Sequence, residues 1–350
     1  MHKSGRSDYK GRHSVIDAGN TNYLTVAGNF FGSIKVMKTS LNYIFIIVLT
    51  LWAPLVLAQP GQWVNMTCTS GSGTGSYYWQ NGDSYEGQCR DQKLDGRGTL
   101  TMSNGDRYVG LWQDNQQNGQ GTYYGANGDR YEGQWLNGLQ HGQGTYTQAN
   151  GDRYVGEWDQ SRKHGQGGLT LANGDRYEGS WELDKMSGQG TYFWANGDRY
   201  EGQWLNSNQH GQGILKRING DLYEGDFRES LRHGQGTYYW ANGDTYEGQW
   251  QDGRQTGSGK KTWANGDVYE GEMREDNLHG SGIFQWANGN RYEGQFQNDE
   301  LNGRGTFFWP NGDSYSGLWE NGQRHGPGAF TYATGTEVVM VFEHGQRVEQ

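Results

Sequence analysis

The sequence has little proline, little cysteine and only one long hydrophobic run. Proline accounts for 4 and cysteine for 2 of the 350 residues. Two cysteines exclude a disulfide-dense scaffold and a zinc array built on cysteine. Hydrophobic residues make up only 32 % of the chain, which excludes an ordinary globular enzyme with an aliphatic core.

Glycine and the aromatic residues are abundant instead. The chain has 60 Gly, 15 Trp, 23 Tyr and 11 Phe, whereas glycine averages about 7 % in proteins. The strict Gly-X-Y period of collagen is absent, and a chain so rich in aromatics is not a typical disordered one. The aromatic rings must therefore pack on glycine backbone.

Charge is distributed unevenly along the chain. Residues 1–58 carry six Lys and Arg against two Asp and Glu, a net +4. Because the whole chain has a net charge of −10, the remainder carries −14. An acidic body does not favour DNA, RNA or anionic membranes, so we expect no nucleic-acid partner.

The one long apolar run occupies residues 41–58 and follows Met37 and Lys38. Read from Met37, residues 37–58 have the parts of a signal peptide, with cleavage between Ala58 and Gln59. Residues 1–36 would then lie upstream of the true start. Alternatively the run is an uncleaved single-pass anchor and the basic residues 1–36 form its cytoplasmic tail. Both interpretations predict a body that is exported (secreted, periplasmic or in the cell envelope) or held outside the cytoplasm.

Both cysteines lie in that exported body. Cys68 and Cys89 could form a disulfide, which persists in oxidising compartments, or they could be two unrelated thiols. A bridge would close about 20 residues and staple one end of the fold.

A 23-residue repeat dominates the sequence. Tyr recurs every 23 residues from Tyr85 to Tyr315, Gly follows two residues later, and Trp or a substitute follows after two more. A Gly-x-Gly pair and an Asn-Gly-Asp triplet complete most units. Eleven units run without an insertion or deletion, and such a period indicates a repeat architecture.

The unit YEGQWLNGLQHGQGTYTQANGDR at 131–153 resembles a consensus MORN (membrane occupation and recognition nexus) repeat. The resemblance covers 85–337 as eleven repeats. Residues 59–84 hold a degenerate repeat that forms an N-terminal cap, and 338–350 form a C-terminal capping half-repeat. The resemblance implies an extended scaffold, since similar repeats accompany membrane-junction proteins, ciliary spoke proteins and plant phosphatidylinositol phosphate kinases.

Each unit is predicted to form a pair of antiparallel strands, because Tyr-x-Gly-x-Trp and Gly-x-Gly-Thr-Tyr both alternate with period two. A two-residue turn and a three-residue turn with Gly in the left-handed conformation are both possible between the strands. The three-residue turn pairs Tyr146 with Tyr154, Gly144 with Gly156 and Gly142 with Trp158. It gathers all rings and glycines on one face, so we predict this register.

Successive units are expected to join through six-residue loops such as 136–141. The predicted fold is all-β: an elongated, single-layer antiparallel meander of hairpins with an open repeat sheet, preceded by one N-terminal hydrophobic signal or anchor helix. Two strands per unit extend the sheet by about 9.6 Å per repeat.

Extra aromatic residues mark the C-terminal half. Triplets such as Tyr238-Tyr239-Trp240 place rings on both faces, and exposed aromatic patches often mark binding surfaces. We predict a partner-binding or self-association surface there, made of Tyr192, Phe193, Trp194, Tyr238, Tyr239, Trp240, Trp263, Trp286, Phe307, Phe308 and Trp309.

Three polar residue types recur as ladders. The histidines at 141, 164, 210, 233, 279 and 325 stand one repeat apart, too far for two to share a zinc ion, so we predict no metal and place these residues in loops. The Asp that follows Asn-Gly is expected to bond turn backbone rather than calcium. Arg107 and Arg153 are the best candidates for phosphate contact, because Val109 and Val155 replace the neutralising Glu found in other repeats.

The sequence shows no nucleophile with its base and no phosphate-cradling loop, so we expect neither an enzyme nor a cofactor. The first hypothesis is a non-catalytic scaffold that binds a protein partner, itself or a phospholipid membrane. The alternative is an exported glycan- or cell-wall-binding module that stacks sugars on Tyr and Trp.

Overall fold

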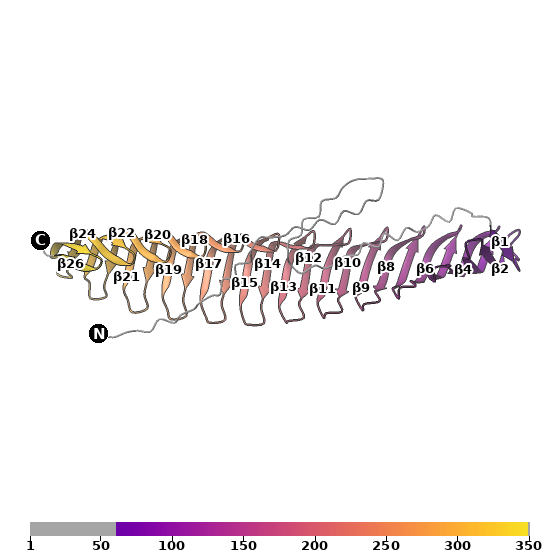
Figure 1. Cartoon of the computed structure of the whole chain (residues 1–350), viewed down its shortest axis with the longest axis horizontal. Helices are drawn as coiled ribbons and strands as arrows, with labels where there is room; N and C mark the ends of the chain where they lie inside the picture. Colours follow the sequence, from indigo (N-terminus) through magenta and orange to yellow (C-terminus); the bar gives the residue numbers. More distant parts are fainter. Residues whose placement is uncertain (1–60, 349–350) are drawn as a thin grey trace, which may run out of the picture. The chain divides into compact units, whose positions relative to one another are not determined.

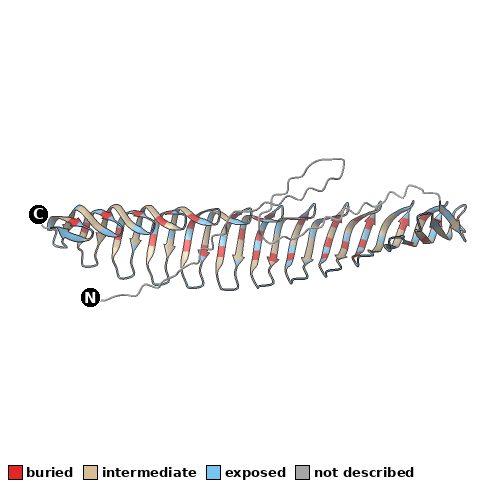
Figure 2. Ribbon diagram, viewed as in Figure 1, coloured by how far each residue is buried: buried red, intermediate tan, exposed pale blue. Residues whose placement is uncertain are grey.

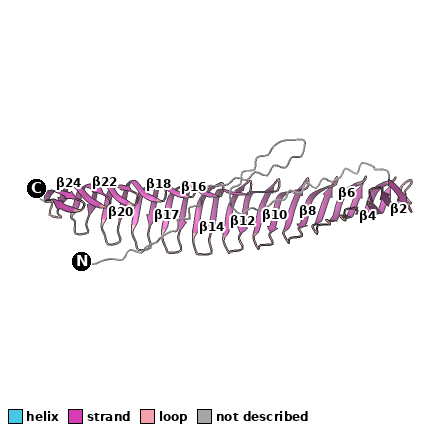
Figure 3. Ribbon diagram, in the orientation of Figure 1, coloured by secondary structure: helices cyan, strands magenta, loops and turns pink. Residues whose placement is uncertain are grey.

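The computed structural model describes residues 61–348, and all regular structure in this range is β-strand (Figure 3). The predicted signal or anchor helix and the cleavage site at Ala58 and Gln59 lie outside the described residues. Within residues 61–348 no helix is long and apolar enough to cross a membrane. The strands are β1 (Gly61–Val64), β2 (Ser72–Trp79), β3 (Ser84–Arg90), β4 (Lys93–Thr101), β5 (Arg107–Gln113), β6 (Gln116–Tyr124), β7 (Arg130–Leu136), β8 (Leu139–Thr147), β9 (Arg153–Asp159), β10 (Arg162–Thr170), β11 (Arg176–Glu182), β12 (Lys185–Phe193), β13 (Arg199–Leu205), β14 (Asn208–Lys216), β15 (Leu222–Arg228), β16 (Leu231–Tyr239), β17 (Thr245–Gln251), β18 (Arg254–Thr262), β19 (Val268–Arg274), β20 (Asn277–Gln285), β21 (Arg291–Gln297), β22 (Glu300–Phe308), β23 (Ser314–Glu320), β24 (Gln323–Thr331), β25 (Glu337–Glu343) and β26 (Gln346–Val348).

These strands form one antiparallel sheet in which each strand pairs with the next along the chain. Figure 1 shows them following one another in sequence order from β1 to β26. Buried positions recur at matching places along the sheet (Figure 2). The predicted all-β, single-layer meander is confirmed.

The predicted register within the hairpins is also confirmed. Tyr146 pairs with Tyr154, Gly144 with Gly156 and Gly142 with Trp158. The turn between β8 and β9 is a three-residue loop: the Gly151 N–H donates to the Gln148 carbonyl at 2.9 Å, and Gly151 has φ +98°. A residue with a side chain is strained at that φ, which explains the glycine.

The predicted six-residue loop after each Trp is wrong. β7 ends at Leu136 and β8 begins at Leu139, so only Asn137 and Gly138 connect them. Both have positive φ, +50° and +81°, as a two-residue type I′ turn requires. The repeated histidines therefore lie in strands; His141, for example, pairs with Gln134 across β7 and β8.

A β-bulge explains this error. Gly133 pairs with Gly144 but Gln134 with His141, which leaves Gly142 and Gln143 as extra residues on β8. Gly142 has φ +58°, and the freed Gln143 N–H donates to Oε1 of Gln134 at 2.9 Å. Bulges break the alternation of side chains, so a period-two reading of the sequence stops at the bulge.

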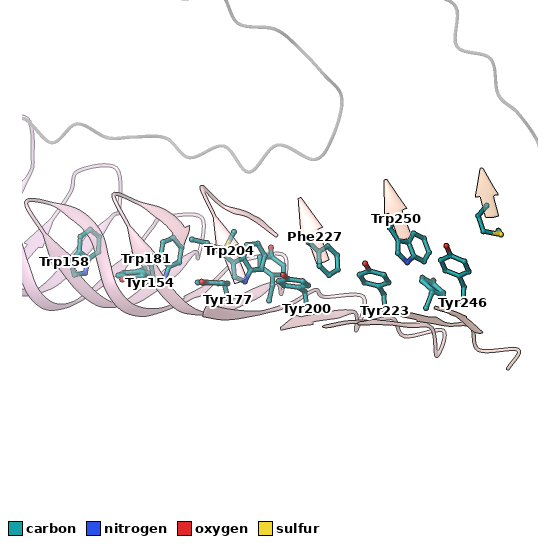
Figure 4. Packing of buried hydrophobic residues seen from close by; sticks show 14 of the residues in the cluster. Tyr154, Trp158, Tyr177, Trp181, Tyr200, Trp204, Tyr223, Phe227, Tyr246 and Trp250 are labelled. Carbon is teal, nitrogen blue, oxygen red and sulfur yellow. The ribbon is translucent and has the colours of Figure 1, made fainter. Parts of the chain in front are cut away.

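The core consists of tyrosine rings that lie over glycine pairs between tryptophans. The Tyr154 ring, 1 % exposed, contacts Trp158 at 5.2 Å and Trp181 at 5.3 Å between centroids, both edge to face. Figure 4 shows this alternation of tyrosines with tryptophans or Phe227 along the sheet. Such ring pairs contribute beyond their buried area, so they take the place of a second layer.

Hydrogen bonds also link neighbouring repeats along the two sides of the sheet where the turns lie. The Asp152 carboxylate accepts the N–H of Ala172 in the next three-residue turn at 2.8 Å. Within its own turn, the backbone N–H of Asp152 donates to Oδ1 of Asn150. On the other side, the backbone N–H of Gln140 donates to Oγ of Ser161 at 3.1 Å. The prediction that the Asp ladder bonds turn backbone is confirmed for the turn of the next repeat; within its own turn the Asp152 carboxylate accepts the side-chain amide of Asn150 rather than a backbone N–H.

The two ends of the sheet differ in chemistry. Cys68 and Cys89 form a disulfide with a Cα–Cα distance of 5.8 Å, beside β2 and β3. At the other end, Phe342 on β25 packs its ring against Tyr315 at 5.3 Å and continues the row of core aromatics.

Candidate interaction surface

A continuous line of aromatic rings runs along the C-terminal repeats beside the core tyrosines. We call it the aromatic row; it comprises Trp240, Trp263, Phe284, Trp286, Phe307, Trp309, Phe330 and Tyr332. From Trp263 onward, successive centroids lie 5.2, 4.5, 5.3, 4.8, 5.4 and 4.8 Å apart. Lys261 joins Trp240 to this line, with Nζ 5.9 Å from the Trp240 centroid and 5.1 Å from that of Trp263.

Strand position explains why the rings meet. Each of the last three repeats contributes one ring from the end of its second strand, as in Phe307 on β22, and one from the first residue of the following turn, as in Trp309. These residues are two apart, so both side chains point to the core face. Phe307 also contacts the core ring of Trp319 at 6.1 Å, which places the row next to the buried core.

The row is a property of the C-terminal half alone. In the earlier repeats, the position equivalent to Trp263 holds Trp79, Met102, Gly125, Gln148 or Leu171, so Trp79 is separated from the row by four repeats without an aromatic residue there. Trp194 is present, but Arg217 occupies the next repeat and interrupts the line. The row is therefore not required by the repeat fold, because the N-terminal repeats form the same hairpins without it.

Partial exposure leaves the row open to a partner. Its tryptophans and phenylalanines are half-buried, and Tyr332 is 41 % exposed. Trp and Tyr combine a large rigid contact area with a polar group, which is why they are frequent at interfaces.

The eleven aromatic residues that the sequence singled out fall into four sets. Five belong to the row, and Trp194 stands apart from it. Tyr192 and Tyr238 are core residues, 5 % and 6 % exposed, whose hydroxyls donate to Asp175 and Asp221. Phe193, Tyr239 and Phe308 lie on the opposite face.

On that opposite face, arginines cover two of the rings. The Arg176 guanidinium lies 4.2 Å from the Phe193 centroid, and that of Arg291 lies 5.2 Å from Phe308. Sequence reasoning missed Phe284, Phe330 and Tyr332, although their repeat positions match those of Phe307 and Trp309.

The opposite face is polar, and most of its arginines are neutralised. Arg130 pairs with Glu132 at 2.5 Å and Arg291 with Glu293 at 2.7 Å. Arg107 lies on the Tyr124 ring at 4.9 Å. Arg153 forms no ion pair with any residue in 61–348. Since β5 and β9 are four strands apart, about 19 Å, Arg107 and Arg153 cannot hold one phosphate together.

Acidic residues on the polar face lose their arginine partners in the C-terminal half. Glu224, Glu247 and Glu270 have Leu222, Thr245 and Val268 where other repeats have Arg. A shallow groove of this face is lined by Glu201, Glu224, Glu247 and glycine backbone. Glu224 faces Ile214 and Thr237 across the strands, whereas Lys260 lies opposite both Glu247 and Glu270.

Burial shifts the pKa of several groups in the core. It raises the pKa of Tyr246 and of Tyr292 to about 12, because the tyrosinate would be desolvated. Burial also lowers the pKa of Lys163, whose Nζ lies 5.4 Å from the Tyr154 centroid and 5.1 Å from that of Trp181. These shifts follow from packing, and those of the core tyrosines recur along the sheet.

Comparison with solved structures gives only low TM-scores. The TCP domain of SAS-4 from Drosophila melanogaster, solved with a proline-rich motif of Ana2, has 13 % identity and a TM-score of 0.30, covering 44 % of this chain and 84 % of that one. The TCP10 domain of CPAP from Danio rerio has 9 % identity, a TM-score of 0.21 and coverages of 72 % and 99 %. Virginiamycin B lyase from Staphylococcus aureus has 8 % identity and a TM-score of 0.14, and the match covers 70 % of this chain and 83 % of that one. No function is transferred from these proteins.

Comparison with family models gives a decisive match, whereas no curated protein matches the chain. The family model described as MORN repeat matches residues 72–84 and then eleven consecutive 23-residue segments, from 85–107 to 315–337. The partial first match coincides with the degenerate repeat that the sequence indicated. The chain belongs to the MORN-repeat family, with twelve consecutive repeats across residues 72–337.

Proposed function

We propose that this MORN-repeat protein is a non-catalytic scaffold that binds a protein partner through its aromatic row. The observation that carries the proposal is the unbroken ring contact from Trp263 to Tyr332. Half-buried Trp and Tyr rings in a contiguous patch are the residues that dominate binding energy at protein interfaces. The N-terminal repeats fold without such a row, so folding alone does not account for it.

Charge favours a protein over a phospholipid surface. Residues 59–350 carry a net charge of −14, and most arginines of the polar face, though not Arg153, are paired with glutamate or stacked on rings. Anionic membranes attract unpaired Lys and Arg. We further propose that the scaffold acts outside the cytoplasm, either after signal cleavage at Ala58 or on an uncleaved anchor; the apolar run at 41–58 supports this.

Substitutions in the row test the proposed function. In the full chain, Trp286→Ala with Trp309→Ala removes two central rings, and Gln148→Ala with Leu171→Ala changes two equivalent positions where no row exists. Cross-linking with mass spectrometry would compare the partners of each variant, with circular dichroism as the check on folding. We expect the first double variant to lose protein cross-links, hetero- or homotypic, and the second to keep them.

Two assays on the same proteins define the contrary outcomes. Cosedimentation with insoluble polysaccharide that depends on Trp286 and Trp309 would favour the glycan-binding alternative. Cosedimentation with anionic vesicles that high salt abolishes would favour lipid binding. Cross-links unchanged by loss of both rings would refute the aromatic row as the binding surface.

A further inference from the structure

Three potential metal ligands converge at the C-terminal end of the sheet. Glu320 ends β23, His325 lies on β24, and His344 is in the turn between β25 and β26. One ligand atom from each residue lies within 4.8 Å of the other two. The three residues come from three different segments, so the pairing of β23, β24 and β25 brings them together.

The cluster is absent from the other repeats that have histidine at the same position. His279 is equivalent to His325, but Arg274 and Asn298 stand where the last repeat has Glu320 and His344. At His233 the corresponding residues are Arg228 and Asp252. Histidines at equivalent positions are one repeat apart. His325 is nevertheless close to His344, because His344 belongs to the turn of the following unit.

His325 has an unused buried atom directed at this cluster. Its Nδ1 is buried and has no hydrogen-bond partner among the described residues, although Oε2 of Glu320 lies 3.5 Å away. The ring centroid of His344 lies 5.5 Å from that of His325. Nδ1 of His233 and of His279 also lacks a hydrogen-bond partner, so what distinguishes His325 is that ligand atoms of Glu320 and His344 lie close enough to share a metal ion with it.

We propose that Glu320, His325 and His344 form a zinc site that clips the last turn of the sheet to β23 and β24. Zinc takes imidazole nitrogen and carboxylate oxygen at about 2.1 Å in tetrahedral geometry, which separates ligand atoms by about 3.4 Å. Glu320 and His344 are exposed and can rotate to close the remaining distance. Three protein ligands leave a fourth position for water.

The clip would protect an otherwise weak end. An open sheet exposes unpaired backbone at its edge strands, and β26 is only three residues long with every residue exposed. The opposite end is tied by the Cys68–Cys89 disulfide. Zinc at the C-terminal end would serve the same purpose without a covalent bond.

Zinc titration of the untagged full chain tests this site. We expect one high-affinity Zn²⁺ per chain by calorimetry and no comparable binding of Mg²⁺ or Ca²⁺, which prefer oxygen ligands. His344→Asn introduces the residue that another repeat has at the equivalent turn position, Asn321, where φ is also positive. It should weaken zinc binding at least about tenfold, whereas His279→Asn should leave it unchanged.

Hydrogen exchange gives a second readout that does not depend on affinity alone. Zinc should slow amide exchange in β25 and β26 of the unaltered chain and of His279→Asn, but not of His344→Asn or Glu320→Gln. Equal zinc binding by His344→Asn and the unaltered chain would overturn the proposal. So would tight zinc binding without slower exchange in β25 and β26.

Discussion

Each core tyrosine occupies space that two glycines leave vacant. A Cβ on Gly167 would lie 2.6 Å from Cζ of Tyr154, far inside van der Waals contact. The next residue, Gly168, points to the other face, where a Cβ would meet nothing nearer than the Tyr177 carbonyl oxygen at 3.8 Å. Adjacent glycines in one strand therefore have opposite requirements.

This contrast predicts opposite effects of the same substitution. Gly167→Ala should lower the free energy of unfolding by about 2 kcal/mol, because the Tyr154 ring must move. Gly168→Ala should raise it by about 0.5 kcal/mol, because glycine is unfavourable in a strand. Urea denaturation of both variants measures this; equal destabilisation would show that ring packing over Gly167 is not the cause.

A half-buried lysine should destabilise the fold at neutral pH. Lys163 has Met186 and Leu94 as its equivalents in other repeats, and burial lowers its pKa. The unfolded chain therefore binds the lysine proton more tightly, so stability rises with pH up to the ordinary lysine pKa.

Lys163→Met should thus raise the free energy of unfolding by about 1 kcal/mol at pH 7. The advantage of the variant should shrink as pH approaches 10, because the lysine of the folded state releases its proton before that of the unfolded state does. Urea denaturation at the two pH values measures the difference. A variant less stable than the parent at pH 7 would mean that the cation–ring contacts outweigh desolvation.

At the scale of the turns, two substitutions in neighbouring repeats match each other. Asp267 and Asp313 each accept the N–H of an alanine 20 residues later at 2.8 Å. Between them Asn290 replaces Asp, and the residue 20 positions later is Pro310, which has no N–H to donate. The two exceptions therefore coincide.

A double-mutant cycle tests this coupling. Asn290→Asp combined with Pro310→Ala should restore the bond and exceed the sum of the single changes by about 1 kcal/mol in unfolding free energy. Asn290→Asp alone finds no N–H at Pro310, and Pro310→Ala alone can donate only to the neutral amide oxygen of Asn290, so the coupling measures the gain from a charged acceptor. Strict additivity in urea denaturation would show that the carboxylate does not link the turns.

Periodicity predicted the hairpins but not the connections between them. The aromatic and glycine positions had to share one face, which selected the three-residue turn and its register. The bulge at Gly142 depends on a positive φ and on a hydrogen bond to the Gln134 side chain. Neither feature can be recognised from the spacing of residue types along the chain. The cluster around His325 was missed for a related reason, because equivalent positions were compared and the turn residue His344 is not equivalent.

At the scale of the whole sheet, the buried tyrosines should respond to alkaline pH together. Burial raises the pKa of all eleven repeat tyrosines, from Tyr85 to Tyr315. Their raised pKa values favour the neutral form in the folded state, so the stabilisation is present below about pH 10, the unfolded value, and is lost as pH rises toward 12 and above.

We therefore expect unfolding and tyrosine ionisation to coincide above pH 10. Ultraviolet absorbance of tyrosinate and far-ultraviolet circular dichroism should change in one steep transition. Gradual ionisation while the sheet signal persists would contradict the burial of these rings.

The central claim is that the repeats extend one sheet by a constant step, each contacting only its neighbours. Distances between spin labels at Gln251 and at Leu205, Glu182 or Leu136, which lie two, three and five repeats away at equivalent exposed strand ends, test it most directly. Pulsed electron resonance should give about 19, 29 and 48 Å, an increment of about 9.6 Å per repeat. Distances that level off or fall as repeats are added would contradict the account.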